Sequence, residues 1–181
     1  MNERVLRWEL SGIVLIILAG SALHFGFEWT GYWRPAALFA AVNESTWEHL
    51  KLSFWPGLVF ALLEYGFIKG AMDNFWVAKS LGLFVMPVVT IVLFYGYTAI
   101  LGRNYLPLDI LIFVLAVAAG QLASYRILMG AKMRSFAHRC AVIGLVVMVV
   151  AFSVLSYCPP RFFLFEDPVT GGYGILDSYG E

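Results

Sequence analysis

The chain has 181 residues, of which 61% are hydrophobic and 13% are charged, and its formal net charge is zero. A soluble domain carries about 25% charged residues, so this composition argues against a water-soluble protein. Apolar runs close to the bilayer-spanning length of about 20 residues recur along the chain. We therefore predict an all-α, polytopic helical membrane protein.

Five apolar segments are predicted to cross the membrane as helices. In chain order they comprise residues 9–28, 52–70, 80–101, 107–128 and 138–158. The first shows no convincing signal-peptide cleavage site, and we expect it to be retained. The second is interrupted by Pro56 and Glu64, and its helix could begin near Thr46 and kink at the proline. The apolar stretch 36–42 is too short to cross and is expected to form an interfacial or re-entrant helix.

The chain changes character after the last predicted span. Two prolines after Cys158 stop the helix, and aromatic runs then flank a Pro-Val-Thr-Gly-Gly turn. This pattern is typical of a short hairpin or an ordered loop, and its aromatic content argues against disorder. We expect a transmembrane domain over residues 1–158 and an extracytoplasmic tail over 159–181 that packs on the outer face.

The distribution of Lys and Arg predicts the orientation in the membrane. With the N-terminus inside, the cytoplasmic side holds Arg4, Arg7, Lys69, Lys79, Arg126, Lys132, Arg134 and Arg139, and the outer side holds Arg34, Lys51, Arg103 and Arg161. We therefore predict a multi-pass protein of the cell membrane with a cytoplasmic N-terminus and an extracytoplasmic C-terminus. The basic loop 129–138 on the cytoplasmic side is expected to contact anionic membrane lipids. Carboxylates gather on the outer side, which favours cations over nucleic acid as partners.

The segment from His24 to His49 concentrates ionisable groups at the outer end of the first span. Ionisable groups at membrane depth are costly, and they usually face the protein interior or a water-filled cavity. His24 and Glu28 are four residues apart, so on a helix they would share one face. That spacing suits an imidazole and a carboxylate that bind one metal ion, and it equally suits a hydrogen-bonded pair that joins two helices.

Glu44, Glu48 and His49 form the second half of this segment. Ser45 and Glu48 match a helix capping box, which explains both residues without any function. We hypothesise that the segment binds a divalent metal such as zinc, iron or manganese. The predicted ligands are His24, Glu28, Glu44 and His49. Glu48 would be the catalytic residue, a general base that activates a metal-bound water.

Three functions fit these residues. The first is a metal-dependent hydrolase or transferase that acts on a lipid-linked or amphipathic substrate. The second is a cation- or proton-coupled transporter or binding protein, in which an acidic outer vestibule leads to Glu64 in the second span. The third is a structural or assembly protein, in which the polar groups cap and join helices. The lack of internal repeats counts against a transporter, and the lack of a complete catalytic motif counts against an enzyme.

The stretch VNESTWEHLKLSFWP resembles a family of small prokaryotic integral-membrane proteins defined as a domain of unknown function. The stretch HFGFEWTG before it and FEDPVTGGYG in the tail share this resemblance. The resemblance implies a polytopic bacterial or archaeal membrane protein, and it brings no activity or catalytic residue with it.

Overall fold

A computed structural model describes residues 3–68 and 72–176, so the last part of the predicted tail, residues 177–181, lies outside the described residues. The described residues form six α-helices and one 3-10 helix and no β-strand. The long helices are α1 (Glu3–His24), α3 (Thr46–Ile68), α4 (Phe75–Leu101), α5 (Leu106–Leu128) and α6 (Ser135–Val154). Two short elements, α2 (Gly26–Trp29) and η1 (Arg34–Leu38), join α1 to α3. The predicted all-α fold is confirmed.

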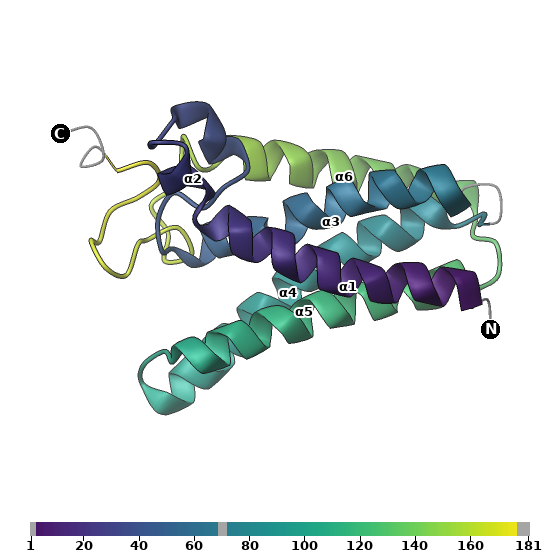
Figure 1. The fold of residues 1–181 in the computed structure, drawn as a ribbon, viewed down its shortest axis with the longest axis horizontal. Coiled ribbons are helices and arrows are strands. Elements are labelled where there is room, and N and C mark those ends of the chain that lie inside the picture. The colour runs from purple at the N-terminus through teal and green to yellow at the C-terminus, as the bar shows by residue number, and fades with distance from the viewer. Residues whose placement is uncertain (1–2, 69–71, 177–181) are drawn as a thin grey trace.

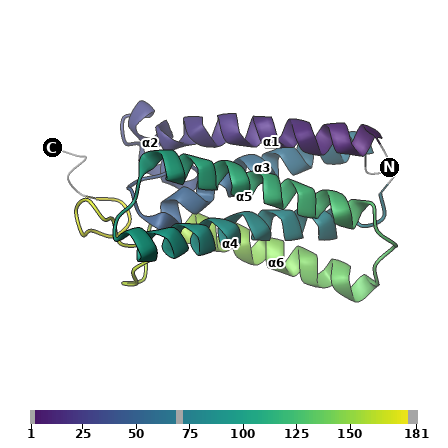
Figure 2. The same ribbon diagram turned by 90° about the horizontal axis from the view of Figure 1, so that it is seen from below.

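Four of the long helices, α1, α4, α5 and α6, are long and apolar enough to cross a membrane. The fifth, α3, has 23 residues, which is about 34 Å of helix at the usual rise per residue. It runs beside the other helices in the bundle (Figures 1 and 2). Its charged residues Glu48, Lys51 and Glu64 make it less apolar, but all three are buried inside the protein.

The bundle has two distinct ends (Figure 1). The N-terminus and the α3–α4 and α5–α6 connections lie at one end, which we call the N-terminal end. The α1–α3 connection, the α4–α5 turn and the tail lie at the other, which we call the loop end. Between the ends, α4 packs along α5, α1 packs against α3 and α5, and α6 packs against α4.

The outward face of α6 is strongly apolar. Its large aliphatic side chains Val142, Ile143, Val146, Val147 and Val150 are each 47–63% exposed. A contiguous apolar surface of this kind marks contact with lipid or with another protein. Together with the four apolar helices, it is consistent with a protein that resides in a membrane.

Two of the lysines that entered the topology prediction are not in loops. Lys51 is 0% exposed and Lys79 is 3% exposed, so neither contributes to the charge of a loop. Lys69 lies outside the described residues. Eight basic residues minus Lys69 and Lys79 leave six at the N-terminal end, and four minus Lys51 leave three at the loop end. The charge asymmetry persists, and a cytoplasmic N-terminal end stays a prediction.

The boundaries of α1 and α3 differ from the predicted spans, and the differences position the site. The first helix ends at His24, because the chain turns at Phe25 before it continues as α2. The predicted helix over residues 9–28 is therefore divided, and His24 and Glu28 sit on separate elements. The second long helix, α3, begins at Thr46, which confirms the expected start near this residue and lies six residues before the predicted span 52–70.

The described part of the tail packs on the first turn of α3. The ring of Trp47 stacks on Phe165 with a centroid distance of 4.6 Å. The side-chain amide of Asn43 donates a hydrogen bond of 2.8 Å to the carbonyl oxygen of Gly174. These contacts tie residues 165–174 of the tail to the segment that leads into α3.

The backbones of α4 and α5 come into contact at two glycines. A Cβ on Gly82 would lie 2.8 Å from the carbonyl oxygen of Gly120, and a Cβ on Gly120 would lie 2.6 Å from that of Gly82. Small residues at such positions let helix backbones come into contact, which is how membrane helices gain packing energy without a hydrophobic driving force.

We therefore expect Gly82→Ala to lower the stability of the protein by about 1–3 kcal/mol, the usual cost of overpacking. The matched control is Gly96→Ala on the same helix, where a Cβ would meet no atom within 4 Å. Thermal unfolding of both variants in detergent checks this, with a fall in Tm for the first variant only. Equal Tm values for the two variants would contradict the glycine contact.

Candidate functional site

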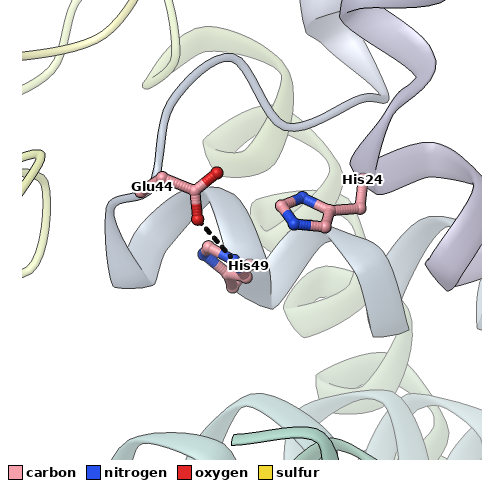
Figure 3. Close-up of side chains that lie close together, drawn as sticks. All are labelled: His24, Glu44 and His49. Carbon is pink, nitrogen blue, oxygen red and sulfur yellow. Dashed lines mark ion pairs between the residues drawn. The ribbon is translucent and has the colours of Figure 1, made fainter. Parts of the chain in front are cut away.

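Three of the predicted ligands meet where α1 ends and α3 begins. His24 is the last residue of α1, Glu44 lies just before α3, and His49 lies in the first turn of α3. Their possible ligand atoms, one from each residue, all lie within 4.8 Å of one another. Figure 3 shows the two imidazole rings and the carboxylate gathered in one place at the loop end.

His49 is held by the backbone in an orientation that suits a metal ligand. Its Nδ1 lies 2.9 Å from the carbonyl oxygen of Ser45. A carbonyl only accepts, so Nδ1 carries the hydrogen and donates it. In the neutral ring the lone pair then belongs to Nε2, which lies 3.5 Å from the Glu44 carboxylate. A cation between these two atoms would turn the contact into a favourable one, and a metal ion bound by both is one such arrangement.

His24 completes the group. Its ring centroid lies 5.2 Å from that of His49. Its Nδ1 is buried and has no hydrogen-bond partner among the described residues. A buried polar atom without a partner costs about 1–3 kcal/mol, so this nitrogen favours a water or an ion beside it.

The group is open to the surface. The side chain of Glu44 is 52% exposed and that of His49 is 35% exposed, so a solvent ion can reach both. Ligands of one tetrahedral ion, each at about 2.1 Å from it, lie about 3.4 Å apart. The Glu44–His49 distance of 3.5 Å already matches this spacing. Side-chain rotation would have to bring the widest pair about 1.4 Å closer.

The structure places the other two predicted members elsewhere. Glu28 is exposed on α2, beyond the turn at Phe25, and is not part of the group. Glu48 is 1% exposed and its carboxylate is directed into the protein. It accepts hydrogen bonds of 2.6 Å from the Ser156 hydroxyl and 3.1 Å from the Val42 amide. To act as a general base, Glu48 would have to leave these partners.

Glu48 also forms a buried ion pair with Lys51, which sequence reasoning missed because Lys51 was counted as a surface charge. The Lys51 ammonium donates to the carbonyl oxygens of Ala37 and Ala40 at 2.9 and 2.7 Å and to the Ser156 hydroxyl at 2.8 Å. The three-residue spacing on an otherwise apolar helix was the available signal. This ion pair fixes the loop that carries Glu44.

The cap of α3 explains why Glu48 is available for this pairing. The Ser45 hydroxyl accepts the Glu48 N–H at 3.4 Å, as in a capping box. The second hydrogen bond of a capping box would run from the Ser45 N–H to the Glu48 carboxylate. Here the side-chain oxygen of Asn43 accepts the Ser45 N–H instead, at 2.8 Å. The capping-box prediction was therefore right for Ser45 and wrong for the Glu48 carboxylate.

Glu64 does not belong to the group at the loop end. It is 0% exposed and forms an ion pair with Lys79. The sequence separation of 15 residues from His49 to Glu64 corresponds to about 22 Å along the axis of α3. Glu64 therefore lies near the N-terminal end of the bundle.

A family model matches residues 1–175, which is nearly the whole chain. The chain belongs to the family of unknown function DUF6512. The DUF6512 match spans all three stretches on which the resemblance rested and confirms that the resemblance was to a family of unknown function. No curated protein and no solved structure matches the chain. DUF6512 membership brings no substrate or reaction with it, so the functional argument rests on the residues.

We expect the buried ion pair of Glu48 and Lys51 to be needed for stability. Lys51→Met leaves the Glu48 carboxylate buried without a counter-charge, and we expect a loss of about 3–5 kcal/mol of stability. The double variant Lys51→Met/Glu48→Gln removes both charges and should recover much of that loss. Tm values in detergent for the two variants and the parent protein test this. A double variant no more stable than the single one would show that the uncompensated charge is not the cause.

Proposed function

We propose that this protein is a metal-dependent hydrolase or transferase at the outer membrane surface. In this proposal, His24, Glu44 and His49 bind the divalent metal. The observation that supports this most directly is the convergence of two imidazoles and one carboxylate within 4.8 Å. His24 and His49 come from two helices that are separated by a long connection, and Glu44 lies at the end of that connection. Their meeting is a property of the fold.

The composition of the group favours zinc, with iron or manganese as alternatives. Imidazole nitrogen and carboxylate oxygen are ligands that all three metals accept. Two histidines and one carboxylate are also a ligand set of catalytic zinc sites, in which the fourth position holds water or substrate. The hydrogen bond from His49 Nδ1 to the Ser45 carbonyl supports this role, because metal-binding histidines almost always donate their second N–H in this way.

A metal with an open position lowers the pKa of its bound water to about 7 and so supplies a nucleophile near neutral pH. The surroundings support an amphipathic or lipid-linked substrate. Trp29 and Trp33 are 70% and 62% exposed in the same connection, and Phe25 next to His24 is 49% exposed. Exposed aromatic rings at the end of a membrane helix sit at the level of the lipid head groups. A substrate with an apolar anchor would present its polar part at this depth.

A cation- or proton-coupled transporter or binding protein is the second candidate. It is favoured by a different observation, the buried charged residues around Glu64 at the N-terminal end. The two candidates place function at opposite ends of the bundle, so variants at each end distinguish them.

Elemental analysis of the purified, detergent-solubilised protein tests the metal site. We expect about one equivalent of metal per chain, or uptake of about one equivalent when the stripped protein is titrated with Zn²⁺. His24→Ala, His49→Ala and Glu44→Ala should each lower the affinity at least 10-fold because each removes a ligand. Glu28→Ala is the matched control, since Glu28 is an exposed carboxylate of the same connection outside the group. It should bind as the parent protein does.

Circular dichroism must show that each variant keeps its helical content. Undiminished metal in both histidine variants would overturn the assignment. So would a parent protein that takes up no more zinc, iron or manganese than a His24→Ala/His49→Ala double variant. The polar residues of this segment would then be left with the structural role that Ser45, Asn43 and Lys51 already have.

A further inference from the structure

A second group of charged residues is buried near the N-terminal end, where α1, α3 and α4 meet. Glu9, Glu64 and Lys79 are 1%, 0% and 3% exposed, respectively. The Lys79 ammonium donates to Glu9 Oε1 at 2.7 Å and is also in contact with the Glu64 carboxylate. Both carboxylates therefore lie against the same nitrogen. We call these three residues the triad.

The formal charges of the triad do not balance. Two carboxylates and one ammonium sum to −1, and an uncompensated buried charge costs several kcal/mol even after the protein relaxes. The described neighbours on α5 add no charge, because they are the neutral side chains of Ser124 and Gln121. This imbalance requires one further positive charge.

Among the residues that the structure describes, the other ionisable groups near the triad do not supply that charge. Tyr65 on α3 and Tyr125 on α5 pack around an adjoining apolar cluster, and a phenol never carries a positive charge. On α1, Arg7 pairs with Glu3 at the surface, and Arg4 is exposed and donates to the carbonyl oxygen of Phe67. A proton is the smallest cation that restores neutrality, and it needs no coordination shell.

The hydrogen bonds indicate which carboxylate takes the proton. Glu9 Oε1 accepts from both Lys79 and the Ser124 hydroxyl, at 2.7 and 2.8 Å, and donors of this kind stabilise the ionised form. Glu64 has less of this support. Its Oε2 contacts the same Lys79 ammonium but accepts from no hydroxyl, and its Oε1 has no hydrogen-bond partner among the described residues. Glu9 Oε2 also lacks a partner there, so a Glu64 hydroxyl has an unused acceptor on the neighbouring carboxylate.

We propose that the triad is a proton-binding site and that Glu64 holds the proton. Glu64 lies four residues from the end of α3 and Lys79 four residues from the start of α4, about 6 Å along each helix from the N-terminal end. A proton at this depth exchanges with one side of the membrane. Ionisable residues inside membrane proteins commonly mark such proton pathways. The inference is independent of the metal site at the loop end.

Infrared spectroscopy of the full-length protein near neutral pH tests the proposal, because a protonated carboxyl group has a carbonyl stretching band that a carboxylate lacks. We expect this band in the parent protein, with a shift when water is replaced by D₂O. It should be lost in Glu64→Gln. The double variant Lys51→Met/Glu48→Gln is the matched control, since Glu48 is equally buried but shares its ammonium with no second carboxylate, and removal of both charges leaves none uncompensated. That variant should retain the band.

Two further variants test the charge count. Glu9→Gln leaves one carboxylate and one ammonium, so Glu64 should ionise and the band should disappear although Glu64 is still present. Lys79→Met leaves two carboxylates without an ammonium, so both should be protonated and the band should grow about twofold. A gain of signal of this kind cannot result from loss of the fold. Circular dichroism on each variant checks that the helices remain.

Absence of the band in the parent protein would overturn the proposal, and so would its persistence in Glu64→Gln. A band that appears only when Na⁺ and K⁺ are removed would also overturn it, because an alkali cation would then be the missing charge. None of these outcomes affects metal binding by His24, Glu44 and His49, so the two proposals fail separately.

Discussion

An ammonium group inside a hydrophobic bundle is tolerated only when a counter-charge lies against it and each of its hydrogens has an acceptor. Lys51 satisfies both conditions with the Glu48 carboxylate, two carbonyl oxygens of the α1–α3 connection and the Ser156 hydroxyl beyond α6. These partners come from three separate parts of the chain. The demand of a single buried charge therefore holds the loop end together, and the group of His24, Glu44 and His49 depends on that order.

The two buried charged groups of the bundle differ in their balance. At the loop end one carboxylate meets one ammonium, and the surrounding donors and acceptors are used. At the N-terminal end two carboxylates meet one ammonium, and one oxygen of each carboxylate, Glu9 Oε2 and Glu64 Oε1, has no partner among the described residues. A pair whose charges cancel is suited to a purely structural role. An unbalanced group suits the binding of one more cation, because its neutrality depends on what it binds.

The group of His24, Glu44 and His49 differs from both because it is partly open to solvent. Its residues come from the end of one helix and the start of another, and the capped first turn of α3 orients His49. Such a site combines a rigid support with an accessible face, which metal-assisted chemistry on a membrane-anchored substrate requires. DUF6512 membership adds no reaction to this argument, so the ligand geometry carries it.

Composition and apolar run length were enough to predict an all-helical chain with five long helices, because a span must be apolar over a fixed length whatever its neighbours are. Residue type and helix-end signals also selected His24, Glu44 and His49 for attention. Sequence could not show that the turn at Phe25 moves Glu28 away, or that Lys51 and Lys79 lie inside the bundle. Lys79 meets Glu9 across 70 residues of chain. Contacts of this kind depend on which helix faces pack together, and the packing of several helices is a property of the tertiary structure alone.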